Sequence, residues 1–225
     1  MPTLQRTDDV FVLDLGDGEN RFTPEWMSSI TDALDEVDAA VGPRALLTVA
    51  SGKIWSNGLD LDWLADHRDQ AAEYIQQVQG VFARFLTSTV TTIAVLQGHT
   101  FAAGSLLALA HDSRLMRSDR GFFCLPEVDI SIAFSPGMSA LVQARLTPNT
   151  AHEAMCTGRR YGGTDALDAG IVDSALPLEE LLPAATELAH SLSGKAGPTL
   201  QTIRTTMYSH VIELLNRKAM LNIPM

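Results

Sequence analysis

The chain has 225 residues, 46% of them hydrophobic, so it can bury one sizeable core. Its formal net charge of −11 repels a phosphate backbone, and this excludes nucleic acid as an expected partner. No apolar run approaches the length needed to cross a bilayer, so no membrane partner is expected either.

The first half of the chain alternates strand and helix signals. Residues 9–22 are typical of a strand that ends in a glycine-rich turn, and Thr23 before Pro24 indicates the start of a helix that Gly42 and Pro43 close. Residues 44–52 form a short apolar run, which predicts a strand buried on both faces of a parallel sheet. Residues 53–67 are predicted to form an exposed polar loop that leads into a long helical region ending near residue 88.

The second half repeats the pattern and then becomes helical. Residues 91–101 indicate a strand and loop, from which a helix opens directly over 101–112. Two short strands are expected within 113–128, and Ser135 before Pro136 marks another helix. Beyond Thr147, helices are expected over 147–158, 164–170, 178–194 and 198–220. The prediction is an α/β core over residues 1–180 followed by a C-terminal helical region over 181–225.

Glu127 is the most informative residue, because it is the lone glutamate in the apolar run 121–134, GFFCLPEVDISIAF. Burial of an unpaired carboxylate disfavours its charged form, so its pKa should rise toward neutrality, as suits a general base. The alternative is a structural carboxylate that caps a turn or pairs with Arg114 or Arg120. His99 is the rival base, since imidazole titrates near neutrality, although a polar contact at a strand end is the expected role.

Five segments in order carry a family resemblance: GDGENRFTPEW (16–26), SGKIWSNGLDLDWL (51–64), GHTFAAGSLLALAHDSRLMRSDRGF (98–122), LPEVDISIAF (125–134) and ALDAGIVDSALP (166–177). With them the chain resembles the enoyl-CoA hydratase/isomerase (crotonase) superfamily, most nearly its Δ3-Δ2-enoyl-CoA isomerases of fatty acid β-oxidation. The resemblance implies a crotonase-like spiral of repeated ββα units and an acyl-CoA substrate that carries its own coenzyme A. It implies no further cofactor, no metal, and a homotrimer or dimer of trimers.

The resemblance also implies an oxyanion hole made of two backbone N–H groups. These belong to Leu59 in the NGLDL segment and to Ala103 in the FAAG segment, where the start of a helix adds a favourable field for negative charge. Glu127 matches the position of an acid that moves protons at the carbons beside the thioester. Asp60 is expected to be structural in the loop that the family uses near the CoA adenine. Substrate or CoA contacts are implied at Ser56, Asn57, Gly58, Asp60, Leu61, Gly104 and Leu106.

The residue at position 106 directs the functional prediction. Hydratases of the superfamily place a second glutamate there, and this chain has Leu106, so water loses one of two anchors and hydration should be poor. An allylic isomerisation needs only one base, and the apolar neighbours Phe101, Ile132 and Phe134 would exclude water. A Δ3-Δ2-enoyl-CoA isomerase is therefore predicted. A hydratase, another crotonase-type acyl-CoA enzyme, or a catalytically silent acyl-CoA binder remain alternatives.

Several smaller expectations concern single residues and segments. Cys124 and Cys156 show no metal or disulfide spacing and are expected to be buried thiols in a reducing compartment. The N-terminus lacks a secretory apolar core and the C-terminus a Ser-Lys-Leu-type ending, so a cytoplasmic protein is expected. Lys53 and Arg68 are candidates to contact CoA phosphates, and residues 63–80 are expected to set the depth of the acyl pocket. Histidines other than His99 are expected on helix surfaces or in linkers.

Overall fold

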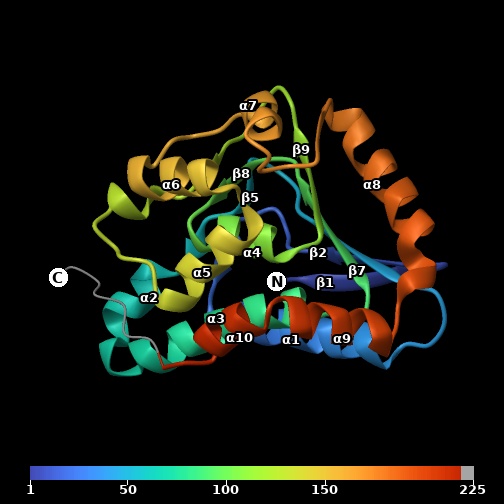
Figure 1. The fold of residues 1–225 in the computed structure, drawn as a ribbon, viewed down its shortest axis with the longest axis horizontal. Helices are drawn as coiled ribbons and strands as arrows, with labels where there is room; N and C mark the ends of the chain where they lie inside the picture. The colour runs from blue at the N-terminus through green and yellow to red at the C-terminus, as the bar shows by residue number, and fades with distance from the viewer. Residues whose placement is uncertain (219–225) are drawn as a thin grey trace.

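A computed structural model describes residues 1–218, in which the strands form three sheets (Figure 1). The largest has the order β1-β2-β4-β7-β9-β11, and only the β1–β2 pair is antiparallel. A second, parallel sheet has the order β10-β8-β5, and β3 pairs with β6 in a third. The strand bounds are β1 Thr3–Thr7, β2 Val10–Asp14, β3 Arg21–Phe22, β4 Ala45–Val49, β5 Ile54–Ser56, β6 Gly58–Leu59, β7 Thr91–Leu96, β8 His99–Phe101, β9 Ser113–Arg117, β10 Phe123–Cys124 and β11 Ser174–Leu176.

One structural unit recurs along the chain. A strand of the large sheet is followed by a short strand of the small sheet and then by a helix: β4, β5 and α3 (Ala71–Leu86), then β7, β8 and α4 (Ala103–Ala110), then β9, β10 and α5 (Pro136–Arg145). The neighbour order is the same in both sheets, with β7 between β4 and β9 and β8 between β5 and β10. This confirms the predicted spiral of repeated ββα units.

The large sheet is buried on both faces, as the apolar run 44–52 predicted. Alternate residues of a strand point to opposite faces, so Leu46 of β4 joins the main core while Leu47 joins a smaller cluster. In that smaller cluster, Leu181, Ala185 and Ala189 of α8 (Leu178–Leu192) cover the outer face of the sheet. Figure 1 shows α8 on one side of the sheet and α3, α4 and α5 on the other.

Helix starts agree with the predicted capping residues. Thr23 accepts a hydrogen bond from the backbone N–H of Trp26 at 3.1 Å and starts α1 (Pro24–Ala39). Ser135 accepts one from the N–H of Met138 at 3.1 Å and starts α5. Thr147, which was not predicted as a cap, accepts one from the N–H of Thr150 and starts α6 (Pro148–Thr157). Each cap satisfies an N–H group that has no acceptor inside its own helix.

The C-terminal region packs back onto the core. The helix expected over 198–220 is divided at Tyr208 into α9 (Pro198–Met207) and α10 (Ser209–Leu215). Residues 219–225 lie outside the described part of the chain, and so does the C-terminal ending on which the expectation about an import signal rests. The buried Arg204 anchors α9 by donating to the carbonyls of Ser88 and Val90, while α10 packs against α5 and α3. Helix α7 (Gly163–Asp168) precedes β11. The predicted boundary at residue 180 stays a prediction.

The prediction for residues 53–67 is wrong. Trp55 and Ser56 are fully buried in β5, the chain then enters β6, and α2 (Leu61–Asp66) follows. Polar and glycine residues there suggested a loop because local sequence does not show that their backbone pairs with β3 and β8. Residues 63–80 form parts of α2 and α3 and a 3₁₀ turn (Arg68–Gln70).

Three other features differ from expectation. Strands β1 and β11, which form the two edges of the large sheet, were not predicted. Cys156 is exposed whereas Cys124 is buried. His111 is fully buried rather than superficial, because its two ring nitrogens reach the Leu107 carbonyl and the Thr48 hydroxyl, both at 2.8 Å.

Among residues 1–218, the helices all fall short of the length and apolarity that a membrane span requires.

Candidate active site

Three segments meet at one edge of the small sheet. Strands β5, β8 and β10 run parallel as neighbours, so the residues that follow their C-terminal ends lie close together. Leu59, Ala103 and Glu127 come from these three segments, and all three line one cavity of about 480 Å³. The structure therefore brings together the three residues for which the sequence predicts the roles of catalytic acid and oxyanion donors, and those roles stay predictions.

Contacts between the first two segments fix their spacing. The Ser56 hydroxyl donates to the Asn20 carbonyl at 2.7 Å and accepts the N–H of Gly58 at 3.1 Å. Gly58 has a φ of +80°, and a Cβ there would lie only 2.6 Å from the nitrogen of Ala103. Only glycine permits this approach, because it lacks a Cβ and tolerates positive φ. The Leu59 segment is thereby held against the start of α4.

The start of α4 shows backbone strain. Ala102 has φ 50° and ψ −124°, a conformation costly for a residue with a Cβ, and its N–H donates to the Cys124 carbonyl at 3.0 Å. Ala103 follows as the first residue of α4, where N–H groups lack helical acceptors and the helix dipole is positive. The Ser105 hydroxyl, donating to the carbonyls of Thr100 and Cys124, ties the same turn to β8 and β10.

Glu127 lies in a 3₁₀ turn (Pro126–Val128) and is 7% exposed. Burial raises the pKa of its carboxyl to about 7, which confirms the expected direction. Its Oε2 atom is buried without a hydrogen-bond partner. The alternative of an arginine pair is wrong within residues 1–218: Arg114 instead pairs with Asp173, and no basic nitrogen lies within 4.0 Å of the Glu127 carboxylate.

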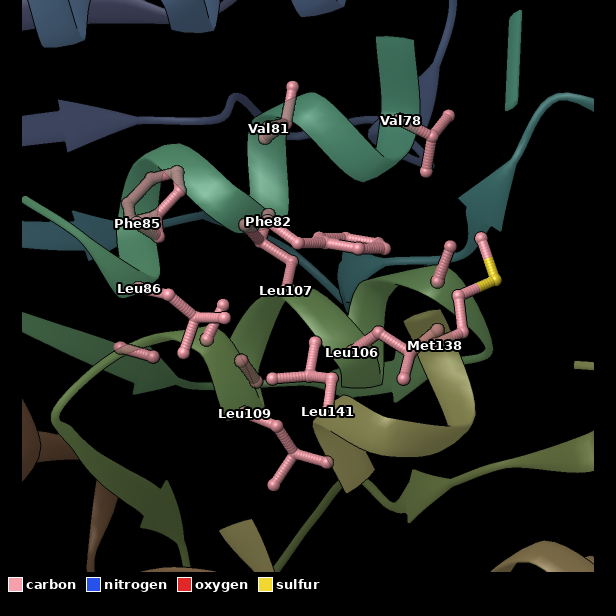
Figure 2. Close-up of a cluster of buried hydrophobic side chains, with 14 of the residues drawn as sticks. Val78, Val81, Phe82, Phe85, Leu86, Leu106, Leu107, Leu109, Met138 and Leu141 are labelled. Atoms are coloured by element: carbon pink, nitrogen blue, oxygen red, sulfur yellow. The ribbon is translucent and has the colours of Figure 1, made fainter. Parts of the chain in front are cut away.

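An apolar wall completes this part of the cavity. Leu106 of α4 is 1% exposed and lies in the same buried cluster as Met138 and Leu141 of α5 (Figure 2). Phe101, Ile132 and Phe134 also line the cavity, as predicted. In the described lining, Glu127 is the only acidic side chain.

The remaining predicted contacts fall into two groups. Asn57, Leu61 and Leu106 line the cavity, whereas Ser56, Gly58, Asp60 and Gly104 are not among its lining residues. Asp60 caps α2 by accepting the N–H of Trp63 at 3.2 Å, and a Cβ at Gly104 would lie 2.6 Å from the Ser56 carbonyl oxygen. These four residues shape the segments around the cavity, and their contact with substrate stays a prediction.

Sequence reasoning missed part of the lining, including Arg160 and Met138. His99, which the sequence named as the rival base, also lines the cavity, and so does Lys53, which the sequence named as a candidate for CoA phosphates. The other candidate, Arg68, lies outside this lining and donates to the Ala65 carbonyl. No spacing in the sequence links Arg160 to the cavity, since it follows α6. The lining also takes no residue from 63–80, so the expectation about pocket depth is wrong for the described residues.

Comparisons with known proteins agree with this geometry. Residues 6–224 match the sequence model described as Enoyl-CoA hydratase/isomerase. The chain is 36% identical to Enoyl-CoA delta isomerase 2, peroxisomal, of Arabidopsis thaliana, covering 96% of this chain and 95% of the relative, and 34% identical to Enoyl-CoA delta isomerase 3 of the same plant, covering 97% of each.

Solved structures share the fold at lower identity. An enoyl-CoA hydratase from Mycobacterium marinum superposes with a TM-score of 0.86 at 22% identity, covering 96% of this chain and 95% of that one. An enoyl-CoA hydratase/isomerase family protein from Pseudomonas syringae gives 0.88 at 23%, with coverages of 96% and 94%. Because the family model matches residues 6–224 and a relative is 36% identical over nearly its whole length, the chain belongs to the enoyl-CoA hydratase/isomerase family.

Proposed function

We propose that the protein is a Δ3-Δ2-enoyl-CoA isomerase that uses Glu127 as its single base. Glu127 removes a proton from C2 of a 3-enoyl thioester and returns it to C4, which moves the double bond into conjugation with the carbonyl. The observation that supports this most directly is one buried carboxyl group, with a pKa raised to about 7, in a cavity whose described lining holds no other acid. Such a group can accept and return a proton near neutral pH.

The backbone would stabilise the intermediate. Removing the C2 proton places negative charge on the thioester oxygen, and the N–H groups of Leu59 and Ala103 are proposed to hold it. Donors fixed before the reaction stabilise developing charge without reorganising. The close contact at Gly58 and the anchoring of Ala102 and Ser105 support this role, because they hold both segments rigidly.

Hydration is disfavoured by the same lining. Addition of water across the double bond calls for a second anchor, and that position holds the buried Leu106. An apolar wall also protects the dienolate from stray protons. Another crotonase-type activity would share the oxyanion segments and give a different product, and a silent binder would bind acyl-CoA without turnover.

The central test uses purified protein and a 3-enoyl-CoA, with formation of the conjugated 2-enoyl thioester followed by absorbance. Glu127→Gln should abolish conversion, whereas Glu36→Gln, an exposed glutamate on α1, should leave it unchanged. Conversion by the Glu127 variant at a wild-type rate would remove this residue from the mechanism.

A second test supplies a 2-enoyl-CoA and measures the 3-hydroxyacyl product. Little or no product is expected, and rapid hydration would overturn the interpretation of Leu106. Isothermal titration with a saturated acyl-CoA separates a silent binder, which would bind the ligand yet convert neither substrate.

Assembly, compartment and cofactors are part of the same proposal. The family resemblance supports a homotrimer or dimer of trimers, and light scattering after size exclusion measures the mass.

The cytoplasm is the proposed compartment, although the Arabidopsis relative is named peroxisomal, and imaging of a fluorescent fusion distinguishes the two. The reaction is proposed to need no metal or resident cofactor, so activity should survive dialysis against EDTA.

A further inference from the structure

The segment that carries Leu59 depends on anchors from other parts of the chain. Leu59 belongs to β6, which has only two residues, and α2 begins two residues later. By contrast, the turn that carries Ala103 is tied to β8 and β10 by the Ser105 hydroxyl. A backbone donor in so short a strand keeps its position only when hydrogen bonds from surrounding residues fix the peptides beside it.

A buried tyrosine provides one of these anchors. Tyr74 lies near the start of α3 and is 1% exposed, and its hydroxyl oxygen accepts the backbone N–H of Asp60 at 2.9 Å. On the other side of Leu59, the N–H of Gly58 donates to the Ser56 hydroxyl at 3.1 Å. The peptides before and after the one that carries the Leu59 N–H are therefore both tied. Because a peptide is planar, this fixes the two Cα atoms between which that N–H lies.

The tyrosine itself is held in place. Trp63 stacks on the Tyr74 ring with 5.0 Å between the ring centroids, and His67 stacks on Trp63 at 4.3 Å. Burial raises the pKa of the Tyr74 phenol, so the hydroxyl stays neutral at the pH of an activity assay. The acceptor for the Asp60 N–H therefore has a fixed position and a constant charge.

Helix α3 connects this anchor to the second donor segment. It packs against α4, where Phe82 of α3 lies in the same buried cluster as Leu106 and Leu107 of α4 (Figure 2). Ala103 is the first residue of α4. The Tyr74 hydroxyl thus sets the position of the Leu59 segment relative to the helix that carries Ala103. Tyr74 is not among the residues that line the described cavity, so it acts through Asp60 and not by touching a substrate.

We infer that Tyr74 is a positioning residue for the reaction, because its hydroxyl holds the Leu59 N–H at the spacing from the Ala103 N–H that the thioester oxyanion requires. The inference rests on the proposed function, which assigns the oxyanion to these two groups. Donors fixed in advance stabilise the charge that develops during reaction more than they stabilise the neutral thioester. Loss of the hydroxyl should therefore weaken binding of an enolate and leave binding of a neutral thioester unchanged. A residue that only supported the fold would affect both ligands alike, or neither.

The test compares Tyr74→Phe with the wild type on two ligands that bind without turnover. Octanoyl-CoA carries a neutral thioester, whereas 3-oxooctanoyl-CoA loses the proton between its two carbonyls and binds as an enolate that absorbs in the ultraviolet. Isothermal titration gives the affinities, absorbance gives the bound enolate, and circular dichroism gives the folded fraction. The matched control is Tyr208→Phe, because the Tyr208 hydroxyl also accepts a hydrogen bond, from Arg145 at 2.6 Å, and lies outside the described cavity lining.

Tyr74→Phe should bind the enolate about tenfold more weakly, because a donor shifted by a fraction of an ångström costs less than the roughly 100-fold of a 1 Å displacement. With a 3-enoyl-CoA, kcat should fall by a similar factor while KM stays unchanged. Octanoyl-CoA should bind Tyr74→Phe as tightly as the wild type, and Tyr208→Phe should match the wild type in every measurement. Equal losses for both ligands, no loss for either, or an equal loss in the control would overturn the inference.

A second variant keeps the test decisive if Tyr74→Phe does not fold. Placing 3-fluorotyrosine at position 74 retains the ring and the hydroxyl but makes the oxygen a weaker acceptor, so enolate affinity should fall below the wild-type value. Wild-type affinity in that protein would overturn the inference. Equal enolate binding by the wild type and Tyr74→Phe refutes the role of Tyr74 alone. A wild type that binds the enolate but does not isomerise a 3-enoyl-CoA refutes the proposed activity and leaves the role of Tyr74 standing.

Discussion

Replacing Gly58 by alanine should damage both folding and the oxyanion segments. A Cβ at this position would lie 2.6 Å from the Ala103 nitrogen, and 3.0 Å from both the Gly104 nitrogen and the Phe101 carbonyl oxygen. These are backbone atoms, which cannot turn away as a side chain could. The Leu59 and Ala103 segments would have to separate by about 0.8 Å to restore ordinary contact.

Two costs add in this variant. Overpacking against fixed atoms costs about 1–3 kcal/mol, and a residue with a Cβ at φ +80° adds about 1–3 kcal/mol of strain. The matched control is Gly42→Ala, because Gly42 has φ +85° with no atom within 4 Å of the added Cβ, so only the strain remains. Urea unfolding should therefore rank the wild type above Gly42→Ala, and Gly42→Ala above Gly58→Ala.

Activity provides a second measure of the same change. Displacing a reacting group by about 1 Å can cost roughly 100-fold in rate, so kcat per folded Gly58→Ala molecule should fall by about that factor. Circular dichroism at the assay temperature gives the folded fraction, and Gly42→Ala should retain wild-type kcat. Equal unfolding midpoints and equal kcat for the two variants would refute the claim that this contact fixes the donor spacing.

Three further predictions concern polar groups that are buried or half-buried. The raised pKa of Glu127 means that the folded state keeps a proton that the unfolded chain releases, so the free energy of unfolding falls as pH rises from 4.5 to about 7. In urea unfolding, Glu127→Gln should therefore be more stable than the wild type by about 3 kcal/mol at pH 8 and by little at pH 4. Burial lowers the pKa of His111 to about 3, so the unfolded chain takes up a proton that the folded state does not, and the free energy of unfolding falls as pH drops below 6.5. Between pH 7 and pH 5, the free energy of unfolding of the wild type should fall by about 2 kcal/mol more than that of His111→Phe. Parallel pH profiles for the two proteins would contradict this. Arg145 donates to three carbonyls at the end of α4, so Arg145→Met should lower the free energy of unfolding by about 2–4 kcal/mol. Arg145→Lys should restore only part of this loss, because an ammonium group cannot reach all three carbonyls. An unchanged thermal midpoint for Arg145→Met would contradict this anchoring role.

Local features of the sequence predicted much of the fold. The caps at Thr23 and Ser135 and the apolar run around β4 depend on neighbouring residues, so they could be recognised without a structure. Where tertiary pairing overrides local character, prediction failed. Residues 54–59 have the composition of a loop, yet Trp55 is buried and the backbone joins two sheets. His111 shows the same effect, since its burial depends on a bond to Thr48 in another strand.

The helix caps, the motifs that carry the family resemblance, and a lone glutamate with apolar neighbours could all be recognised from the sequence, since each depends on residues close together along the chain. Which distant residues share the cavity depends instead on how the strands and helices pack. Arg160 meets Lys53 and His99 only because parallel strands and the segment after α6 converge there. The same packing leaves Glu127 and His99 with buried atoms without partners, because hydrogen-bond satisfaction depends on every element packed around an atom.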